Sequence, residues 1–230
     1  MAACGISRGE RGAMCGRMLV FTNDEVREIL RTMRRVENPF PDWPARASIN
    51  AYPQSEVPVV SALDEAEDAT VSPIRILRWG YPVEWSPSPV FNTRIESLVA
   101  GKGMWRASAE NGRCLIPTRG FFERHATETV RSKKTGRPVK RQYEFKLVDE
   151  PVTWLAGISE DDHFSVVTTE PNQFVAPVHN RMPLVLRPEE LEVWLGSDWG
   201  ELSDRSGIML DVAPEEQPKD DAFGDQLSLF

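Results

Sequence analysis

The sequence is poor in the residues that build disulfide frameworks and zinc sites. Its 230 residues include three cysteines (Cys4, Cys15 and Cys114) and three histidines. An odd and widely spaced set of cysteines argues against a disulfide framework and favours a reducing cytoplasm. Neither a Cys-x-x-Cys nor a His-x-x-x-His pair occurs, so the ligand spacing typical of zinc sites is absent and we expect no metal.

Long hydrophobic runs are also missing. No stretch approaches the roughly 18 consecutive apolar residues that a membrane-spanning helix needs, so we expect no membrane partner. Residues 1–13 (MAACGISRGERGA) lack the apolar segment of a secretory signal. We expect these residues to be a leader that is removed, or to precede a true start at Met14.

Positive charge is in short supply. The chain has 27 basic and 35 acidic residues, a net charge of −8 that disfavours bulk attraction to nucleic acid. The charge is unevenly distributed, however. Residues 131–141 (RSKKTGRPVKR) hold six basic residues and no acidic one, whereas the last thirty residues are strongly acidic. A local basic face is therefore allowed, although a solvated loop explains the same run.

Short apolar runs and turn residues dominate the rest. Seven strands are predicted after the first, which follows Met14, and helices are predicted at 22–38, 94–105 and 187–195. The predicted strands span residues 18–21, 57–60, 74–79, 113–117, 142–148, 152–158, 164–169 and 183–186. The pattern predicts an α+β fold, a single domain over 14–203 with a mixed, curved, barrel-like sheet and few flanking helices. Residues 204–230 are acidic and proline-containing, which predicts a disordered tail.

Cys15 follows Met14 directly and precedes a strand. A lone cysteine in this position is often a small buried hydrophobe. If the chain instead begins at Cys15, the residue carries a thiol and an α-amine whose pKa is about 8. Such a 1,2-aminothiol condenses with an aldehyde to give a five-membered thiazolidine. Cys15 by itself does not distinguish a buried structural cysteine from an N-terminal nucleophile.

Three further polar residues are candidates for chemistry. Asn92, in FNTRIES, either caps a helix or donates a hydrogen bond beside Arg94, a candidate phosphate ligand. Glu123 follows two aromatic residues, so it is either a solvated charge or a desolvated carboxylate with a raised pKa. His179 precedes Arg181 by two residues and is either a hydrogen-bonded loop histidine or a proton shuttle.

Taken in order, several segments resemble the SRAP family, the SOS response-associated peptidase domain that processes abasic sites in DNA. The resemblance covers roughly residues 14–196 and depends on the order and spacing of the motifs. The matching segments are MCGR (14–17), INAYP (49–53), RWGYPVEW (78–85), FNTRIES (91–97), RCLIPTRGFFE (113–123), WLAGI (154–158), FSVVTT (164–169) and VHNRMPLVL (178–186).

The resemblance implies a chemistry and a set of site residues. Cys15 would form a thiazolidine with the ring-opened aldehyde of an abasic deoxyribose, preferentially in single-stranded DNA. Asn92 would orient the cysteine or the sugar, and Glu123 and His179 would transfer protons. The residues it implies as DNA-binding are Arg17, Trp79, Trp85, Arg94 and Arg181, although a core position is an alternative for at least one tryptophan. No cofactor is implied, because the substrate supplies the electrophile.

The last five residues form a separate signal. Gln226, Leu227, Ser228, Leu229 and Phe230 resemble the pentapeptide that binds the bacterial sliding clamp. Leu229 and Phe230 would fill a hydrophobic cleft and Gln226 would hydrogen-bond at its rim. An ordinary amphipathic chain end is the alternative.

Three classes of function are therefore open. The leading hypothesis is a monomeric cytoplasmic protein that crosslinks itself to abasic sites, shields them from cleavage, and has weak lyase activity through the Schiff base. The second is a cysteine peptidase, which cuts its own leader or other proteins. The third is a non-catalytic DNA-binding adaptor tethered to the clamp.

Overall fold

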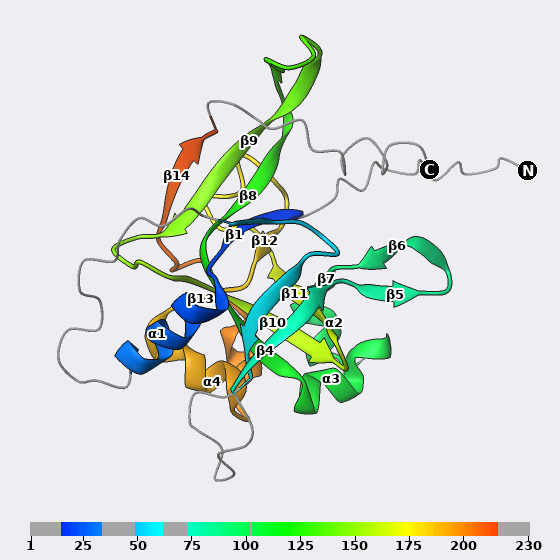
Figure 1. Ribbon diagram of the computed structural model, residues 1–230, viewed down its shortest axis with the longest axis vertical. Helices are drawn as coiled ribbons and strands as arrows, with labels where there is room; N and C mark the ends of the chain where they lie inside the picture. The colour runs from blue at the N-terminus through cyan, green and yellow to red at the C-terminus, as the bar shows by residue number, and fades with distance from the viewer. Residues whose placement is uncertain (1–14, 34–48, 62–72, 102, 216–230) are drawn as a thin grey trace, which may run out of the picture.

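The structure is a computed structural model, and it describes residues 15–33, 49–61, 73–101 and 103–215 (Figure 1). The strands are β1 (Arg17–Val20), β2 (Ile49–Ala51), β3 (Glu56–Val60), β4 (Ile74–Trp79), β5 (Tyr81–Val83), β6 (Ser86–Val90), β7 (Asn92–Arg94), β8 (Arg113–Arg131), β9 (Pro138–Leu147), β10 (Thr153–Glu160), β11 (His163–Thr169), β12 (Met182–Pro183), β13 (Val185–Leu186) and β14 (Leu210–Pro214). The α-helices are α1 (Asn23–Met33), α2 (Ile95–Val99), α3 (Arg106–Asn111) and α4 (Leu191–Leu195), and the 3-10 helices are η1 (Gly103–Trp105), η2 (Pro188–Glu190) and η3 (Trp199–Ser203).

Five strands close into a barrel. Strand β10 pairs with β11, β11 with β4, β4 with β3, β3 with β8, and β8 again with β10, so the hydrogen-bonded path returns to its start. The β11–β4 pair is parallel and the other four are antiparallel. Closure leaves none of these five strands as a free edge. The predicted α+β domain with a mixed, barrel-like sheet and few helices is confirmed.

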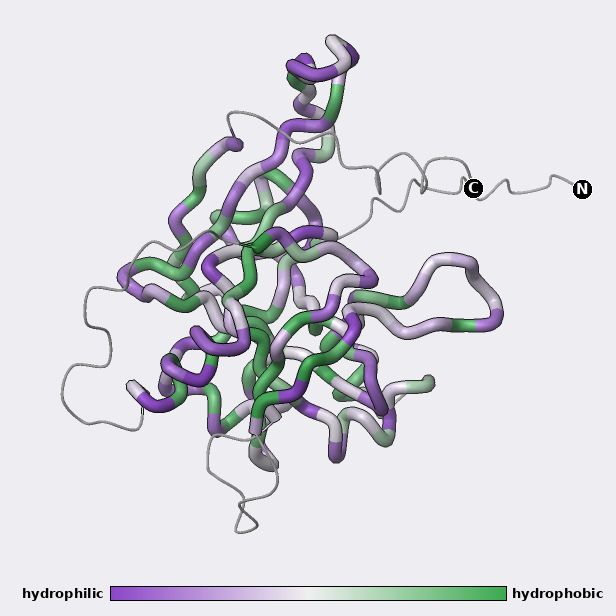
Figure 2. The backbone as a smooth tube through the Cα atoms, in the orientation of Figure 1, coloured by the Kyte–Doolittle hydropathy of each residue, from purple (hydrophilic) through white to green (hydrophobic). Residues whose placement is uncertain are grey.

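Two hydrophobic clusters hold the sheet and the helices together. The first contains Cys15, Trp79 and Phe121, all fully buried. The second packs the helices against the sheet through residues such as Ile29 of α1 and Trp194 of α4. Figure 2 shows hydrophobic residues along the central strands and hydrophilic residues at the ends of the projecting hairpins. The site described below lies at the edge of the first cluster, which explains the burial of its polar groups.

Helix α1 begins with a capping box formed by Thr22 and Glu25. The Thr22 hydroxyl accepts a hydrogen bond from the Glu25 amide at 3.3 Å, and the Glu25 carboxylate accepts one from the Thr22 amide at 2.8 Å. These bonds satisfy amide groups that the first helical turn leaves without intrahelical partners. The predicted continuation to residue 38 lies outside the described residues.

Strands β8 and β9 are longer than the sequence predicts. Apolar residues mark only 113–117 and 142–148, but β8 continues to Arg131 and β9 begins at Pro138. The outer half of this hairpin is polar and partly exposed, so it has no apolar alternation to detect. The hairpin projects beyond the rest of the domain (Figure 1).

The prediction of a disordered tail from residue 204 is wrong for residues 204–215. Leu210 is buried and β14 pairs with β9, Leu210 lying opposite Leu147. Arg205 is also buried and forms an ion pair with Glu190 at 2.8 Å. The acidic composition hid a strand whose single buried face needs few apolar residues. The leader (1–13) and the predicted clamp-binding residues Gln226, Leu227, Leu229 and Phe230 lie outside the described residues.

Several short elements have no counterpart in the prediction. These are β2, β7, α3 and the β5–β6 hairpin, all too short for a periodic signal. In the part of the chain that the structure describes, no helix has both the length and the apolar character needed to span a bilayer.

Candidate active site

Strand pairing brings Cys15 to Glu123. Strand β1 runs antiparallel to β8 with Arg17 opposite Phe122, so the residues entering β1 pass the next residue of β8, Glu123. The backbone nitrogen of Cys15 donates to both carboxylate oxygens of Glu123, at 3.0 and 3.2 Å. Cys15 is fully buried and Glu123 is 2 % exposed. In a chain that begins at Cys15, this nitrogen is the α-amine, and the carboxylate lies within hydrogen-bonding distance of it.

Burial changes the proton affinity of both groups. Desolvation raises the pKa of Glu123 from 4.5 to about 8, and the hydrogen bond from Cys15 opposes this increase only in part. Desolvation, together with the nearby Glu123 charge, raises the pKa of the Cys15 thiol well above its usual value. Near neutral pH the site therefore holds a protonated thiol beside a carboxyl group that can give or take a proton.

His179 completes the polar contacts of Glu123. Its Nδ1 lies 3.9 Å from Glu123 Oε2 and 3.2 Å from both the amide nitrogen and the carbonyl oxygen of Arg181. A ring that accepts at Nδ1 carries its proton on Nε2 when neutral. Burial lowers the pKa of His179, which favours this neutral form.

Asn92 approaches Cys15 from a different strand, β7. It begins β7, which runs parallel to β11 with Asn92 opposite Val166. Its side-chain amide donates to the Cys15 carbonyl oxygen at 3.5 Å. The four residues predicted to act together, Cys15, Asn92, Glu123 and His179, are thus brought to one place by three different parts of the sheet and one loop.

The loop that carries His179 is held by a residue that the sequence analysis did not single out. Asn172 is buried, and its side-chain amide donates to the Ile208 carbonyl at 2.9 Å. Its carbonyl oxygen accepts from the amide of Phe174 at 3.1 Å, which fixes the turn before His179. An Asn after a predicted strand is a turn signal, but no sequence pattern links it to the segment after residue 204.

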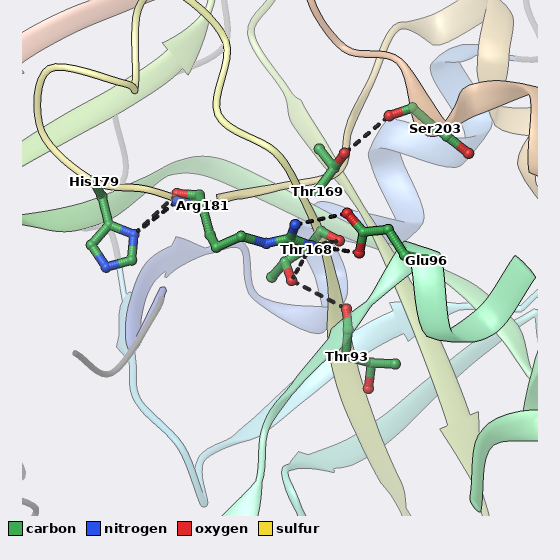
Figure 3. A network of polar contacts seen from close by, with 7 residues as sticks. All are labelled: Thr93, Glu96, Thr168, Thr169, His179, Arg181 and Ser203. Carbon is green, nitrogen blue, oxygen red and sulfur yellow. Dashed lines mark hydrogen bonds and ion pairs between the residues drawn. The ribbon is translucent and has the colours of Figure 1, made fainter. Parts of the chain in front are cut away.

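Arg181 is ion-paired in the structure. Figure 3 shows its guanidinium directed at Glu96 and Thr168 while the His179 ring lies near its backbone. The Glu96 carboxylate accepts two hydrogen bonds from it, at 2.7 and 2.9 Å, and the Thr168 carbonyl accepts a third at 2.8 Å. The bond from Arg181 lowers the pKa of Glu96. The neighbouring Thr93 is buried and bonded to Ser165 at 2.8 Å, so it belongs to the sheet interior.

Arg17 is also engaged. Its guanidinium lies 4.0 Å from the centre of the Phe122 ring, donates to Asn50 at 2.7 Å and pairs with Glu215 at 2.8 Å. Its side chain is 6 % exposed. Phosphate binding by Arg17 or Arg181 stays a prediction, and each guanidinium would have to exchange its carboxylate partner for the phosphate. Arg94 is exposed, and its predicted phosphate binding also stays a prediction.

The two candidate tryptophans differ in position. Trp79 is fully buried, donates from its indole to the Phe91 carbonyl at 2.9 Å, and stacks on Phe164. For Trp79 a role in stacking on bases is wrong, and the alternative of a core residue is confirmed. Trp85 is 73 % exposed, between β5 and β6.

Metal binding has no candidate among the residues described. No three His, Cys, Asp or Glu side chains within those ranges are close enough together to hold an ion.

Comparison with known proteins gives one consistent result. The sequence model described as "SOS response associated peptidase (SRAP)" matches residues 14–218. The abasic site processing protein YoqW of Bacillus subtilis is 26 % identical over 196 residues, covering 79 % of this chain and 80 % of that protein. The abasic site processing protein YedK of Escherichia coli is 27 % identical over 194 residues, covering 79 % of each chain.

A solved structure has the same fold. The crystal structure of a phage-related protein from Bordetella bronchiseptica superposes with a TM-score of 0.60 at 22 % identity, covering 88 % of this chain and 95 % of that one. The family match extends over nearly all of the described residues. The chain belongs to the SOS response associated peptidase (SRAP) family.

Proposed function

We propose that this protein processes abasic sites in DNA by forming a covalent bond to them through Cys15. One observation carries the proposal: the nitrogen of Cys15 lies 3.0 Å from the carboxylate of the buried Glu123. A buried carboxyl group in direct contact with this nitrogen is placed to take a proton from an α-ammonium and return it later. The names of YoqW and YedK support the choice of an abasic site as substrate.

The reaction balances without a cofactor. The α-amine of Cys15 attacks the aldehyde carbon of the ring-opened deoxyribose, and a C–N bond forms. One amine proton passes to the oxygen, the resulting hydroxyl group accepts a proton from Glu123 and leaves as water, and the remaining proton on the nitrogen returns to Glu123, giving an imine. The thiol sulfur then adds to the imine carbon, its proton passes to the nitrogen, and a thiazolidine closes. Neither oxidation nor reduction occurs.

The neighbouring groups have defined tasks in this scheme. The Asn92 amide holds the Cys15 carbonyl and so fixes the direction of the amine. In the neutral tautomer whose Nδ1 accepts from the Arg181 amide, the Nε2–H of His179 is available to donate to the sugar oxygen that opens. The imine also acidifies the adjacent sugar carbon, so loss of that proton and of the 3′ phosphate gives weak lyase activity.

Self-cleavage is a second candidate activity, and the same contact favours it. When residue 14 is still attached, the nitrogen held by Glu123 belongs to the peptide bond before Cys15. Hydrolysis of that bond requires a proton on the leaving nitrogen, which Glu123 in its protonated form can donate. Intact mass followed over time tests this activity: the full-length wild-type chain should convert to a form that begins at Cys15, and the Glu123→Ala variant should keep residues 1–14.

A denaturing gel tests the main proposal. Protein that begins at Cys15 is mixed with a single-stranded oligonucleotide carrying one abasic site, and the sample is heated in detergent. We expect a heat-stable shift that is lost in Cys15→Ala and retained in Cys114→Ala, the matched buried cysteine. Cleavage of a peptide substrate without a shift would support a peptidase instead, and reversible binding alone would support an adaptor.

A further inference from the structure

The outer part of the β8–β9 hairpin carries a concentration of positive charge that the proposed chemistry does not use. Its tip, residues 131–141, contains six basic residues and no acidic one, on a chain whose net charge is −8. Three of these cations are bound within the hairpin: Arg131 to the Gly136 carbonyl, Lys140 to the Ala126 carbonyl and Arg141 to Glu128. The other three, Lys133, Lys134 and Arg137, are exposed.

These three cations have no described carboxylate or carbonyl partner for their side chains within the ranges that the structure covers. Exposed cations alone would not define a binding site, but these three lie in a turn whose backbone is held by several hydrogen bonds. The Ser132 hydroxyl accepts from the amides of Lys134 and Thr135 at 3.2 and 3.1 Å. The Ser132 amide donates to the Arg137 carbonyl at 2.9 Å, and Gly136 adopts a φ of 71°, as such a turn requires.

The hairpin is a direct extension of the strand that holds Glu123. Strand β8 carries Glu123 opposite Tyr143 of β9 and continues to Arg131, which lies opposite Pro138. Pairing in both halves makes the arm a continuous two-stranded ribbon, with one irregularity between Arg124 and Thr129. Figure 1 shows the ribbon standing clear of the domain. A strand advances about 3.3 Å per residue, so the eight steps from Glu123 to Arg131 place the tip on the order of 25 Å from the site.

We propose that this basic arm, defined as the tip residues 131–141, binds the phosphate backbone of the nucleic acid that flanks the processed nucleotide. The proposal rests on the proposed function for the position of the lesion. DNA seated at Cys15 lies at the base of the ribbon, and its backbone is the polyanion that the three exposed cations at the tip would attract. At 3.4 Å per base pair, a 25 Å reach corresponds to roughly seven base pairs of duplex beyond the lesion.

Such contacts have a measurable signature. Each phosphate neutralised by a cation changes the slope of log affinity against log salt by about 0.9 on a duplex and about 0.7 on a single strand. The triple variant Lys133→Gln, Lys134→Gln, Arg137→Gln should therefore lower the magnitude of that slope by about 2 to 3. Between 50 and 200 mM salt, this corresponds to a change in the relative affinity of roughly 20-fold or more.

The experiment measures reversible binding to undamaged DNA by fluorescence anisotropy and, separately, the crosslinking rate at saturating abasic DNA. A matched control, Arg27→Gln, Arg31→Gln, Arg106→Gln, removes three exposed cations from helices α1 and α3. We expect the arm variant to lose affinity and salt dependence, the control to keep both, and the crosslinking rate at saturation to be unchanged in each.

Two results would overturn the proposal. An equal loss of DNA affinity in the arm variant and the control would mean that only the net charge of the protein matters. An unchanged slope of log affinity against log salt in the arm variant would mean that these three cations do not bind phosphates. DNA with fewer than about seven base pairs on each side of the position seated at Cys15 should abolish the difference between wild type and arm variant. Absence of a covalent product in all proteins, with the binding difference intact, would contradict the proposed function and leave the arm as a nucleic-acid contact.

Discussion

Replacing Glu123 by Gln should stabilise the full-length chain as the pH rises. Gln keeps the size of the side chain and an oxygen that accepts from the Cys15 amide, and it removes the ionisable group. The pKa of Glu123 is raised from 4.5 to about 8 by burial, so the folded protein holds this proton more tightly than the unfolded chain. The contribution of Glu123 to stability is complete below about pH 4.5 and is lost progressively as the pH rises to about 8.

The size of the effect follows from the shift. One pH unit corresponds to about 1.4 kcal/mol, so the whole shift is worth on the order of 5 kcal/mol. Between about pH 5 and pH 7.5 the unfolding free energy of the wild type should fall by about 3 kcal/mol relative to Glu123→Gln. Glu56→Gln, which removes an exposed carboxylate, is the control and should follow the wild type.

Urea unfolding at several pH values, with the slope of free energy against urea held constant, measures the difference. The same protein beginning at Cys15 provides a second comparison. There a positive α-ammonium replaces the neutral amide 3.0 Å from Glu123, which lowers the pKa of the carboxyl group and should make the pH dependence shallower. Parallel pH profiles for wild type and Glu123→Gln in the full-length chain would refute the reasoning, because they would mean that Glu123 is not desolvated.

Three further predictions concern the surroundings of the site. Trp79→Ala should lower the unfolding free energy by about 3–5 kcal/mol in urea unfolding, whereas Trp85→Ala should change it by less than about 0.5 kcal/mol. Trp85→Ala should instead weaken the binding of single-stranded DNA by about 1–3 kcal/mol. Unchanged anisotropy curves for Trp85→Ala would exclude stacking of a base on this residue. Asn92→Ala should slow crosslinking up to about tenfold, through loss of the hydrogen bond to the Cys15 carbonyl, and an unchanged single-turnover rate would contradict its orienting task. Glu96→Gln should cost less than about 1 kcal/mol in unfolding, because the Glu96 side chain is half exposed, and a much larger loss would show that its pair with Arg181 is structural.

The barrel strands were predictable from the sequence where a strand is buried along most of its length, because burial requires apolar residues. Strand β10 is buried along almost its whole length and reads as a continuous apolar run, so its position was predicted within two residues. The outer half of β8 was missed because most of its side chains are polar, and β14 was missed because it lies in an acidic segment and pairs with β9, far away in the sequence. Helix α1 was predicted correctly at its start because the capping residues Thr22 and Glu25 are local.

The site residues divide in the same way. Cys15, Glu123 and His179 were predicted from their neighbours and from the family resemblance, and the structure brings them together. The ion pair of Arg17 could not be predicted, because its partner Glu215 is 198 positions away in the sequence. Composition could not distinguish the buried Trp79 from the exposed Trp85 either, since both occur in one short aromatic segment.

The covalent bond to Cys15 is tested most directly by the intact mass of the protein–DNA product, followed by mapping of the modified peptide. The reaction of a chain beginning at Cys15 with one abasic oligonucleotide should give the sum of the two masses less one water, with the added mass on the peptide that starts at Cys15. A product of that mass formed equally by Cys15→Ala, or an adduct located on a lysine, would contradict the account.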